Sequence, residues 1–176
     1  MDFNDLAELI FPDAKDVSYY EEKYPERNLK EGAMVTRFAP SPTGFIHIGG
    51  LFGSIIDRKL AEQSEGVFIL RIEDTDQKRE IENGVEQIVN GLKDFGITPD
   101  EGVISETEEI GNYGPYKQSE RKEIYHTFIK YLIEIGRAYP CFCTKETLDE
   151  LRVMQDHKKQ RTGYYGKYAK CRNLSV

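Results

Sequence analysis

The chain has 176 residues, of which 39% are hydrophobic and 31% charged, and its net charge is −7. This composition is typical of a soluble globular protein of one domain or slightly more, and no apolar run is long enough to span a membrane. The acidic N-terminus does not resemble a secretion signal, and three cysteines fit a reducing compartment better than a disulfide framework. We therefore expect a cytoplasmic protein with no membrane segment.

The charge is unevenly distributed along the chain. Residues 145–176 carry eight Lys and Arg against four Asp and Glu, a local charge of +4. Tyr164, Tyr165 and Tyr168 lie among these basic residues. A basic end with interleaved aromatic rings is typical of a phosphate-contacting surface, and an ordinary solvated face is an equally good interpretation of the composition.

Residues 1–33 are interpreted as a packing or docking extension without chemistry of its own. Residues 5–11 are predicted to form a short helix that stops at Pro12. The charged stretch around Tyr19, Tyr20 and Tyr24 is predicted to be a loop.

The next segment, residues 34–96, predicts alternating strands and helices. Residues 34–39 and 67–70 are apolar runs of strand type. Residues 49–64 have apolar residues at helical spacing with Gly66 as the predicted C-cap, and residues 85–95 form a second amphipathic helix that ends near Gly96. This order predicts a parallel sheet of the α/β class.

The last part of the chain is predicted to be mainly helical. Residues 97–118 are a connector, and Ser119 is the predicted N-cap of a helix that stops at Gly136. Thr144 is predicted to cap another helix, and the tail from Thr162 is irregular.

The most informative stretch runs from Arg37 to Gly50 and reads Arg-Phe-Ala-Pro-Ser-Pro-Thr-Gly-Phe-Ile-His-Ile-Gly-Gly. It predicts a strand end, a turn stiffened by two prolines, and a helix start with His47 at its entrance. Glycines allow a ligand to approach the backbone, and the N-terminus of a helix favours phosphate. We therefore expect a nucleotide phosphate to bind here.

Three ordered blocks resemble one family, the glutamyl-tRNA synthetases of class I. The first is the stretch above, which resembles the HIGH signature region, and the others are residues 70–76 (Leu-Arg-Ile-Glu-Asp-Thr-Asp) and 114–121 (Gly-Pro-Tyr-Lys-Gln-Ser-Glu-Arg). The resemblance implies a Rossmann-type parallel sheet over residues 34–118. It also implies that residues 119–176 begin an inserted α+β subdomain that binds the tRNA acceptor end.

The resemblance implies a two-step reaction with L-glutamate, ATP and tRNA(Glu), in which Mg²⁺ accompanies the ATP phosphates. It also implies that the parent enzyme is monomeric. His47 would stabilise the leaving pyrophosphate, Arg37 would pair with the substrate carboxylate, and Glu73 would take the α-ammonium. Residues 39 (Ala) and 41 (Ser) would line the amino-acid pocket, and residues 43 (Thr), 49 (Gly) and 50 (Gly) would contact ATP. Considered alone, Arg37 is better interpreted as a member of an ion pair at the strand edge.

Cys141, Cys143 and Cys171 are candidate zinc ligands, because some members of the family bind structural zinc with Cys-x-Cys and a later Cys-x-His. Asn173 stands where that histidine is expected. Tyr168 is the candidate fourth ligand, because a tyrosine has this role in a related family, although its spacing to Cys171 is one residue short of that pattern. His157 is a weaker candidate. Zinc usually takes four nitrogen or sulfur ligands. Three free thiols without a metal are therefore an equally open interpretation.

The family's Lys-rich KMSKS-type loop and its anticodon-binding domain have no counterpart here, so we expect this chain to be an N-terminal part with little activity alone. Three alternatives remain open. A glutamyl-queuosine tRNA-modifying paralogue shares the fold, a glutaminyl-tRNA synthetase is disfavoured by the residues at 40–43, and a non-catalytic tRNA- or partner-binding module is the alternative from another class.

Overall fold

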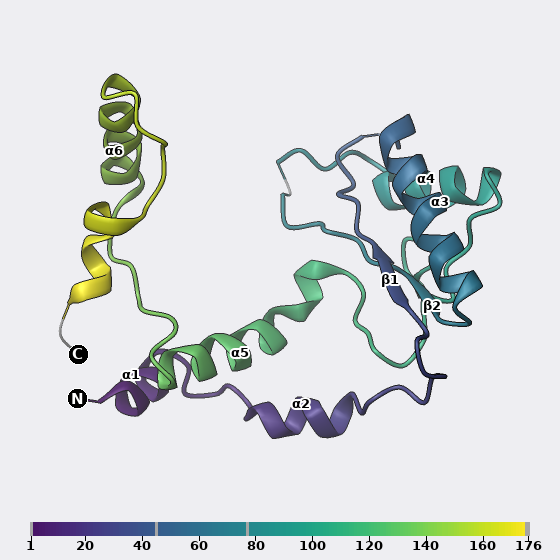
Figure 1. Ribbon diagram of the computed structural model, residues 1–176, viewed down its shortest axis with the longest axis horizontal. Coiled ribbons are helices and arrows are strands. Elements are labelled where there is room, and N and C mark those ends of the chain that lie inside the picture. The colour runs from purple at the N-terminus through teal and green to yellow at the C-terminus, as the bar shows by residue number, and fades with distance from the viewer. Residues whose placement is uncertain (1, 45, 77, 175–176) are drawn as a thin grey trace. The chain divides into compact units, whose positions relative to one another are not determined.

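The computed structural model describes residues 2–44, 46–76 and 78–174. The chain divides into two compact units, and Figure 1 includes both. Ser18–Tyr125 forms the sheet unit, and Met1–Val17 with His126–Val176 forms the helical unit. The N-terminal extension is shared between the two units, and the expected domain boundaries after residues 33 and 118 remain a prediction.

The sheet unit contains a mixed sheet in which, among the described residues, four strands follow the order β1-β2-β3-β4. The strands are β1 (Val35–Phe38), β2 (Val67–Leu70), β3 (Glu101–Val103) and β4 (Glu109–Ile110). The pairs β1–β2 and β2–β3 are parallel, and β4 joins β3 antiparallel. The predicted α/β class with a parallel sheet is therefore confirmed.

Two helices, α3 (Ile48–Gln63) and α4 (Gly84–Asp94), pack on the sheet (Figure 1). Their apolar faces and the inward side chains of the strands form one core. The core consists of Leu51, Ala61, Phe68, Leu70, Ile72, Val85, Ile88, Leu92, Ile97, Val103 and Tyr116. Residues alternate between the two faces of a strand, so Arg71 points to the opposite face from Leu70 and Ile72, while Ile69 is partly buried and still packs against the edge of the core.

The end of α3 differs from the prediction. Its C-cap is Ser64, and Glu65 takes the left-handed position with φ of 56°. Gly66 serves a different purpose, because a Cβ there would lie 1.9 Å from the carbonyl oxygen of Met34. The glycine therefore allows the chain to enter β2 beside β1.

Two further expectations for the sheet unit were wrong. The charged stretch predicted as a loop contains α2 (Val17–Lys23), and the connector predicted after Gly96 contains β3 and β4. Strand β3 depends on Gly102, which has φ of 125° and no room for a Cβ against Leu70. Short strands around a glycine carry too little periodicity to be recognised from sequence.

The helical unit contains α1 (Phe3–Ile10), most of α5 (Lys122–Glu134) and α6 (Lys145–His157), followed by the short 3₁₀ helices η2 (Gly166–Tyr168) and η3 (Lys170–Asn173). Asp2 and Asp5 form a capping box on α1, and Thr144 caps α6 as predicted. Lys130 of α5 is nearly buried and pairs with Glu8 of α1 at 2.6 Å. Within the described ranges, every helix is too short or too polar to cross a bilayer.

Candidate functional site

The loop between β1 and α3 is held by backbone hydrogen bonds to the segment after β2. The carbonyl oxygens of Phe38, Pro40 and Pro42 accept hydrogen bonds from the backbone N–H groups of Arg71, Glu73 and Ile81 at 3.0, 2.9 and 3.0 Å. Parallel pairing thus continues past the end of both strands. The first two sequence blocks therefore form one rigid edge at the carboxyl ends of β1 and β2, where open α/β sheets bind ligands.

His47 is the N-cap of α3. Its Nδ1 accepts hydrogen bonds from the backbone N–H groups of Gly49 and Gly50 at 3.1 and 3.4 Å. Because Nδ1 uses its lone pair in these bonds, the neutral ring carries its proton on Nε2. The imidazole is exposed, so Nε2–H is the donor that this helix entrance presents to a ligand, while the two glycine amides expected to face phosphate are occupied by His47.

A cavity of about 410 Å³ opens at this loop. It is lined by Phe38, Pro40, Ser41, Thr43, Gly44, Ile46, His47, Gly50 and Ile88. Four predicted site residues thus share one cavity, namely Ser41, Thr43, His47 and Gly50. Ala39, Gly49, Arg37 and Glu73 do not line it, and Phe45 of the first block lies outside the described residues.

Arg37 and Glu73 lie on the sheet face opposite the core. Arg37 pairs in register with Ile69, and its exposed guanidinium has no hydrogen-bond or ion-pair partner among the residues that the structure describes. Arg71, two residues beyond Ile69, therefore lies on the same face. Its Nη2 donates to the hydroxyl of Tyr125 at 2.6 Å and lies 3.9 Å from a carboxylate oxygen of Glu73.

Neither Arg71 nor Tyr125 was assigned an individual role from the sequence. The signal was the alternation along residues 69, 71 and 73, which places Arg71 beside Arg37 once the register of the strands is known. The position of Tyr125 depends on a contact 54 residues away along the chain. No local pattern predicts such a contact.

The acidic residues that follow Glu73 organise the backbone. Asp74 accepts hydrogen bonds from the N–H and hydroxyl of Ser119 at 2.8 and 2.6 Å. It therefore anchors η1 (Gln118–Arg121), and the prediction that Ser119 caps the helix with its own side chain was wrong. Asp76 pairs with Arg79 three residues later, so Asp74 and Asp76 have separate partners.

The three cysteines of the helical unit come together. Their sulfur atoms all lie within 4.8 Å of one another, with Cys143 and Cys171 3.7 Å apart. The hydroxyl of Tyr164 lies 3.5 Å from the Cys143 sulfur and accepts a hydrogen bond from the Cys171 N–H at 3.0 Å. The Tyr164 hydroxyl and the backbone N–H of Phe142 lower the pKa of Cys171 to about 7, so this thiol ionises more readily than an ordinary one.

Tyr168, the ligand expected from the resemblance, lies elsewhere. Its hydroxyl donates to the side-chain oxygen of Gln160 at 2.6 Å. His157 is exposed at the end of α6 and does not belong to the cysteine cluster. The aromatic side chain that the structure brings to the thiols is therefore Tyr164, seven residues before Cys171 rather than three.

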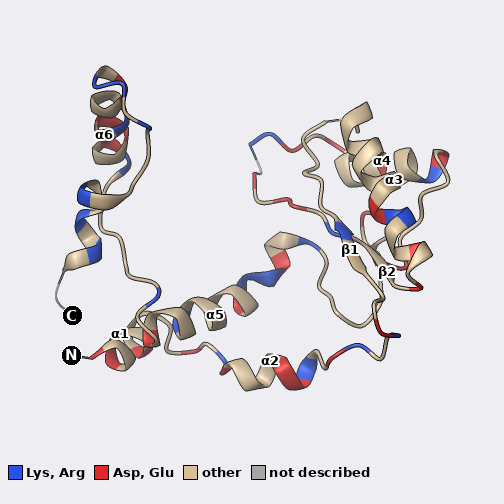
Figure 2. Cartoon of the chain, in the orientation of Figure 1, with Lys and Arg blue, Asp and Glu red and all other residues tan. Residues whose placement is uncertain are grey.

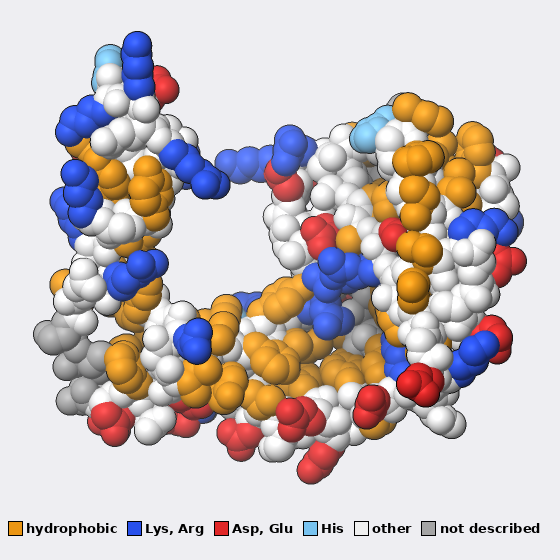
Figure 3. All heavy atoms as spheres, in the orientation of Figure 1, with side chains coloured by type: hydrophobic (Ala, Val, Ile, Leu, Met, Phe, Trp, Pro, Cys, Tyr) orange, Lys and Arg blue, Asp and Glu red, His pale blue; other side chains and the backbone are white. Residues whose placement is uncertain are grey.

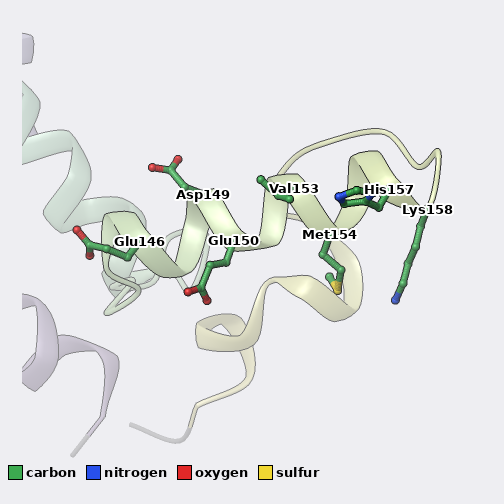
Figure 4. Close-up of a pocket in the computed structure, with 7 residues that line it drawn as sticks. All are labelled: Glu146, Asp149, Glu150, Val153, Met154, His157 and Lys158. Carbon is green, nitrogen blue, oxygen red and sulfur yellow. The ribbon is translucent and has the colours of Figure 1, made fainter.

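A second hollow runs along α6 (Figure 4). It has a volume of about 740 Å³ and is lined by Glu146, Asp149, Glu150, Val153, Met154, His157 and Lys158. All of these residues belong to one helix and its C-cap, and their charged ends point in different directions (Figure 4). The hollow therefore lacks the convergent polar groups of a binding site.

Lys and Arg side chains are frequent on α6 and the segment that follows it (Figures 2 and 3). They include Lys158, Lys159 and Arg161 after the helix, all of which are exposed. The positive charge predicted for residues 145–176 thus lies on the surface of the helical unit, where a polyanion can reach it.

Comparisons with known proteins agree on one family. A family model described as tRNA synthetases class I (E and Q), catalytic domain, matches residues 33–175. The chain is 56% identical over its whole length to a glutamate–tRNA ligase from Acetivibrio thermocellus and 55% identical over 99% of its length to one from Clostridium beijerinckii. It spans 32% of the length of each of these relatives.

A solved structure shows the same fold. It is that of a glutamate tRNA ligase from Elizabethkingia meningosepticum in complex with its amino acid, with a TM-score of 0.68 and 36% identity. The similarity covers 78% of this chain and 26% of that one.

Proposed function

The chain belongs to the catalytic-domain family of the class I E and Q tRNA synthetases, and from that membership we propose that it serves in glutamate–tRNA ligation. Glutamate attacks the α-phosphate of ATP to give glutamyl-adenylate and pyrophosphate, and a ribose hydroxyl of the tRNA(Glu) terminal adenosine then takes the glutamyl group. The observation that carries this proposal is the entrance of α3, where His47 presents Nε2–H beside the cavity of the first block.

His47 acts by charge stabilisation. Because two backbone N–H groups fix the tautomer and the ring, the Nε2–H donor is oriented before the substrate binds. A fixed donor stabilises the charge that develops on leaving pyrophosphate without reorganising during the reaction. Ser41, Thr43 and Gly50 line the same cavity and hold the nucleotide, with Gly49 next to them in the helix entrance.

Among the residues that the structure describes, no carboxylate lines this cavity. Magnesium prefers oxygen ligands and keeps several waters. Mg²⁺ would therefore accompany ATP and be held mainly by phosphate oxygens and water.

The amino acid binds on the neighbouring sheet face. Arg37 takes a substrate carboxylate through its planar guanidinium, and Glu73 takes the α-ammonium. In sequence, Ala39 stands between Phe38 and Pro40, which both line the cavity. Its small side chain leaves room for the substrate. Positioning of the two reactants supplies much of the catalysis, because neither step needs a side-chain nucleophile.

The experiment is tRNA glutamylation by this 176-residue chain and by the longest polypeptide that its gene encodes. We expect charging by the long form, and we expect His47→Ala to reduce its rate by roughly 10²-fold, as for other donors to developing charge. His157→Ala is the matched control, since it removes an exposed histidine outside the cavity. A folded long form that does not charge tRNA(Glu) would favour the modifying paralogue or the binding module.

A structural zinc ion in the helical unit is a second part of the proposal, with Cys141, Cys143, Cys171 and Tyr164 as ligands. Tetrahedral coordination with Zn–S bonds of about 2.3 Å places sulfurs about 3.8 Å apart. The Cys143–Cys171 separation of 3.7 Å and the Tyr164 hydroxyl 3.5 Å from Cys143 support this arrangement. Such an ion would hold residues 141–143 against the segment that ends at Cys171.

Cobalt substitution tests this zinc site. We expect the chain to bind one Co²⁺ with the visible absorption of a tetrahedral thiolate complex, and Tyr164→Phe to change that spectrum and weaken binding. Tyr168→Phe is the matched control and should leave both unchanged. A larger effect of Tyr168→Phe than of Tyr164→Phe on the cobalt spectrum and affinity would contradict the proposed ligand set. A chain that binds no Co²⁺ would contradict the metal site itself and favour three free thiols.

The basic surface of residues 145–174 is proposed to contact the phosphates of the tRNA acceptor end. Its support is the local positive charge in an otherwise acidic chain and the exposure of Lys158, Lys159 and Arg161. Binding through phosphates depends steeply on salt. Replacing these three residues with Gln should therefore weaken tRNA binding and flatten its salt dependence, without a change in adenylate formation.

A further inference from the structure

Three arginines of the sheet unit gather on the sheet face opposite the core. Arg37 of β1 and Arg71 beyond β2 share that face through the register of the strands. Arg121 comes from the end of η1, one helical turn before Tyr125, whose hydroxyl holds Arg71. Figure 3 shows a group of Lys and Arg side chains beside β1.

The arginine cluster (Arg37, Arg71 and Arg121) has one ion-pair contact with a carboxylate among the described residues, in which Glu73 lies 3.9 Å from Arg71. The Arg71 side chain is only 16% exposed. The Arg121 Nη1 donates to the carbonyl oxygen of Pro115 at 2.7 Å, which neutralises no charge.

Two donors in the arginine cluster lack acceptors within the part of the chain that the structure describes. The Nε atoms of Arg71 and Arg121 are both buried, and neither has a hydrogen-bond partner there. Buried donors in native proteins are nearly always satisfied. A pair of unsatisfied guanidinium donors, with a third unpaired arginine beside them, is the arrangement expected around an anion.

The electrostatics of Arg71 agree with this geometry. Burial is the largest effect and lowers the pKa of Arg71. The charges of Arg121 and Arg37 lower it further, against the opposing effects of Tyr125 and Glu73. An anion at this position would relieve both the burial of the charge and the repulsion between cations.

We propose that Arg71 and Arg121 bind the amino-acid substrate together with Arg37, and that the three guanidiniums select a dicarboxylic amino acid over its amide. The inference deepens the proposed function and rests on it. Tyr125 is a positioning residue, because its hydroxyl fixes the Arg71 guanidinium. The charges are complementary, since three cations and the carboxylate of Glu73 face a ligand with two carboxylates and one ammonium.

The position of Glu73 favours a carboxylate ligand over a phosphate. A carboxylate at the edge of the cluster repels a phosphate dianion but attracts the ammonium of an amino acid. Planar guanidiniums also match the planar fork of a carboxylate. Glutamine has the same size as glutamate but would leave the guanidiniums without a second negative charge, and such unpaired groups give strong discrimination.

The test is a titration of this 176-residue chain, observed through the Nε–Hε NMR signals of its arginines. The probes are glutamate, glutarate, glutamine and inorganic phosphate. We expect the Arg71 and Arg121 signals to shift saturably with glutamate and glutarate, and to shift little with glutamine. Arg71→Gln and Arg121→Gln should each weaken glutamate binding by roughly tenfold or more, as expected for hydrogen bonds to a charged group.

Arg79→Gln is the matched control, because Arg79 is exposed and pairs only with Asp76 in its own turn. It should bind glutamate as the unmodified chain does. Tyr125→Phe keeps all three charges and should weaken binding less than Arg71→Gln. Should the glutamine variants fold poorly, the titration of the unmodified chain still decides the question, because it reads the arginine signals directly.

Three results would overturn the inference: glutamate binding that leaves the Arg71 and Arg121 signals unmoved, signals that respond to phosphate but not to glutamate, or no saturable shift with any carboxylate. Failure of the proposed function has a different signature. In that case glutamate and glutarate shift both signals, but the longest polypeptide of the gene makes no glutamyl-adenylate.

Discussion

The sheet unit contains two charged clusters of opposite character. In the first, the Arg27 cluster (Tyr24, Arg27, Glu101, Tyr113 and Tyr116), every charge has a partner. Arg27 forms two hydrogen bonds with the carboxylate of Glu101 and stacks on the ring of Tyr113 at 3.7 Å. The second is the arginine cluster, where, among the described residues, Arg71 lies 3.9 Å from the carboxylate of Glu73 and two Nε donors lack acceptors.

The difference shows how a folded chain distinguishes structural charges from binding charges. The Arg27 cluster joins the N-terminal extension to the third sequence block, because Tyr116 also donates to Glu101 at 2.9 Å and Tyr113 donates to the Pro25 carbonyl at 2.8 Å. Its groups are neutralised within the protein, so it needs no ligand. The arginine cluster has unsatisfied donors among the described residues, and the proposed anionic ligand would satisfy them.

The largest expected effect separates the two clusters by stability. Arg27→Met leaves Glu101 as an unpaired carboxylate that is only 15% exposed, and we expect it to lower the free energy of unfolding by about 3 kcal/mol. Arg37→Met, the same substitution in the arginine cluster, removes an unpaired exposed charge and should change it by less than about 0.5 kcal/mol. Urea denaturation followed by circular dichroism measures both free energies of unfolding. Equal losses of stability in the two variants would contradict the difference between the two clusters.

The Arg27 cluster should also make stability depend on acid. Arg27 holds the pKa of Glu101 below its ordinary value of 4.5, aided by Tyr116 and opposed by burial. A lowered carboxylate pKa stabilises the folded state above that ordinary value, and the stabilisation is lost as the pH falls through the folded pKa. Unfolding free energies between about pH 6 and 3 should therefore decline less for Glu101→Gln than for the unmodified chain.

A control for the acid dependence is the same Glu101→Gln substitution in the Arg27→Met background. Since Arg27 is the main cause of the lowered pKa, the substitution should then change the pH dependence much less. If Glu101→Gln changed the pH dependence equally in both backgrounds, the lowered pKa of Glu101 would be due to Tyr116 or to another group.

The sequence predicted most of the structure near the first block because that information is local. The strands and helices of residues 34–96 follow from apolar periodicity, and the site residues from Ser41 to Gly50 are neighbours along the chain. His47 was identified because a histidine before a glycine pair at a helix start is itself a local pattern. Its capping of those two glycines required coordinates.

The features that sequence did not predict all depend on distant contacts or on weak local preference. Arg27 meets Glu101 across 74 residues and Arg71 meets Tyr125 across 54, and neither pair has a spacing that a motif could encode. Tyr164 replaced Tyr168 beside the thiols because the path of the chain after α6, rather than the count of residues to Cys171, determines which ring arrives. Strand β3 was missed because Gly102 has a low strand propensity.

The smallest predicted effect compares two tyrosine hydroxyls, one in each cluster. The Tyr116 hydroxyl donates to Glu101 and accepts from the Tyr113 N–H at 3.0 Å, so Tyr116→Phe should destabilise the chain by about 1–2 kcal/mol. The Tyr125 hydroxyl only positions Arg71, and Tyr125→Phe should cost at most about 1 kcal/mol.

Ligand binding should rank the same two variants in the opposite order. Tyr116→Phe leaves the arginine cluster intact and should bind glutamate as the unmodified chain does, whereas Tyr125→Phe frees the Arg71 guanidinium and should bind it more weakly. Denaturation and the arginine NMR titration, run on both variants, measure the two rankings. If one variant were weaker in both measurements, stability and binding would share one network, and the division between closed and open clusters would fail.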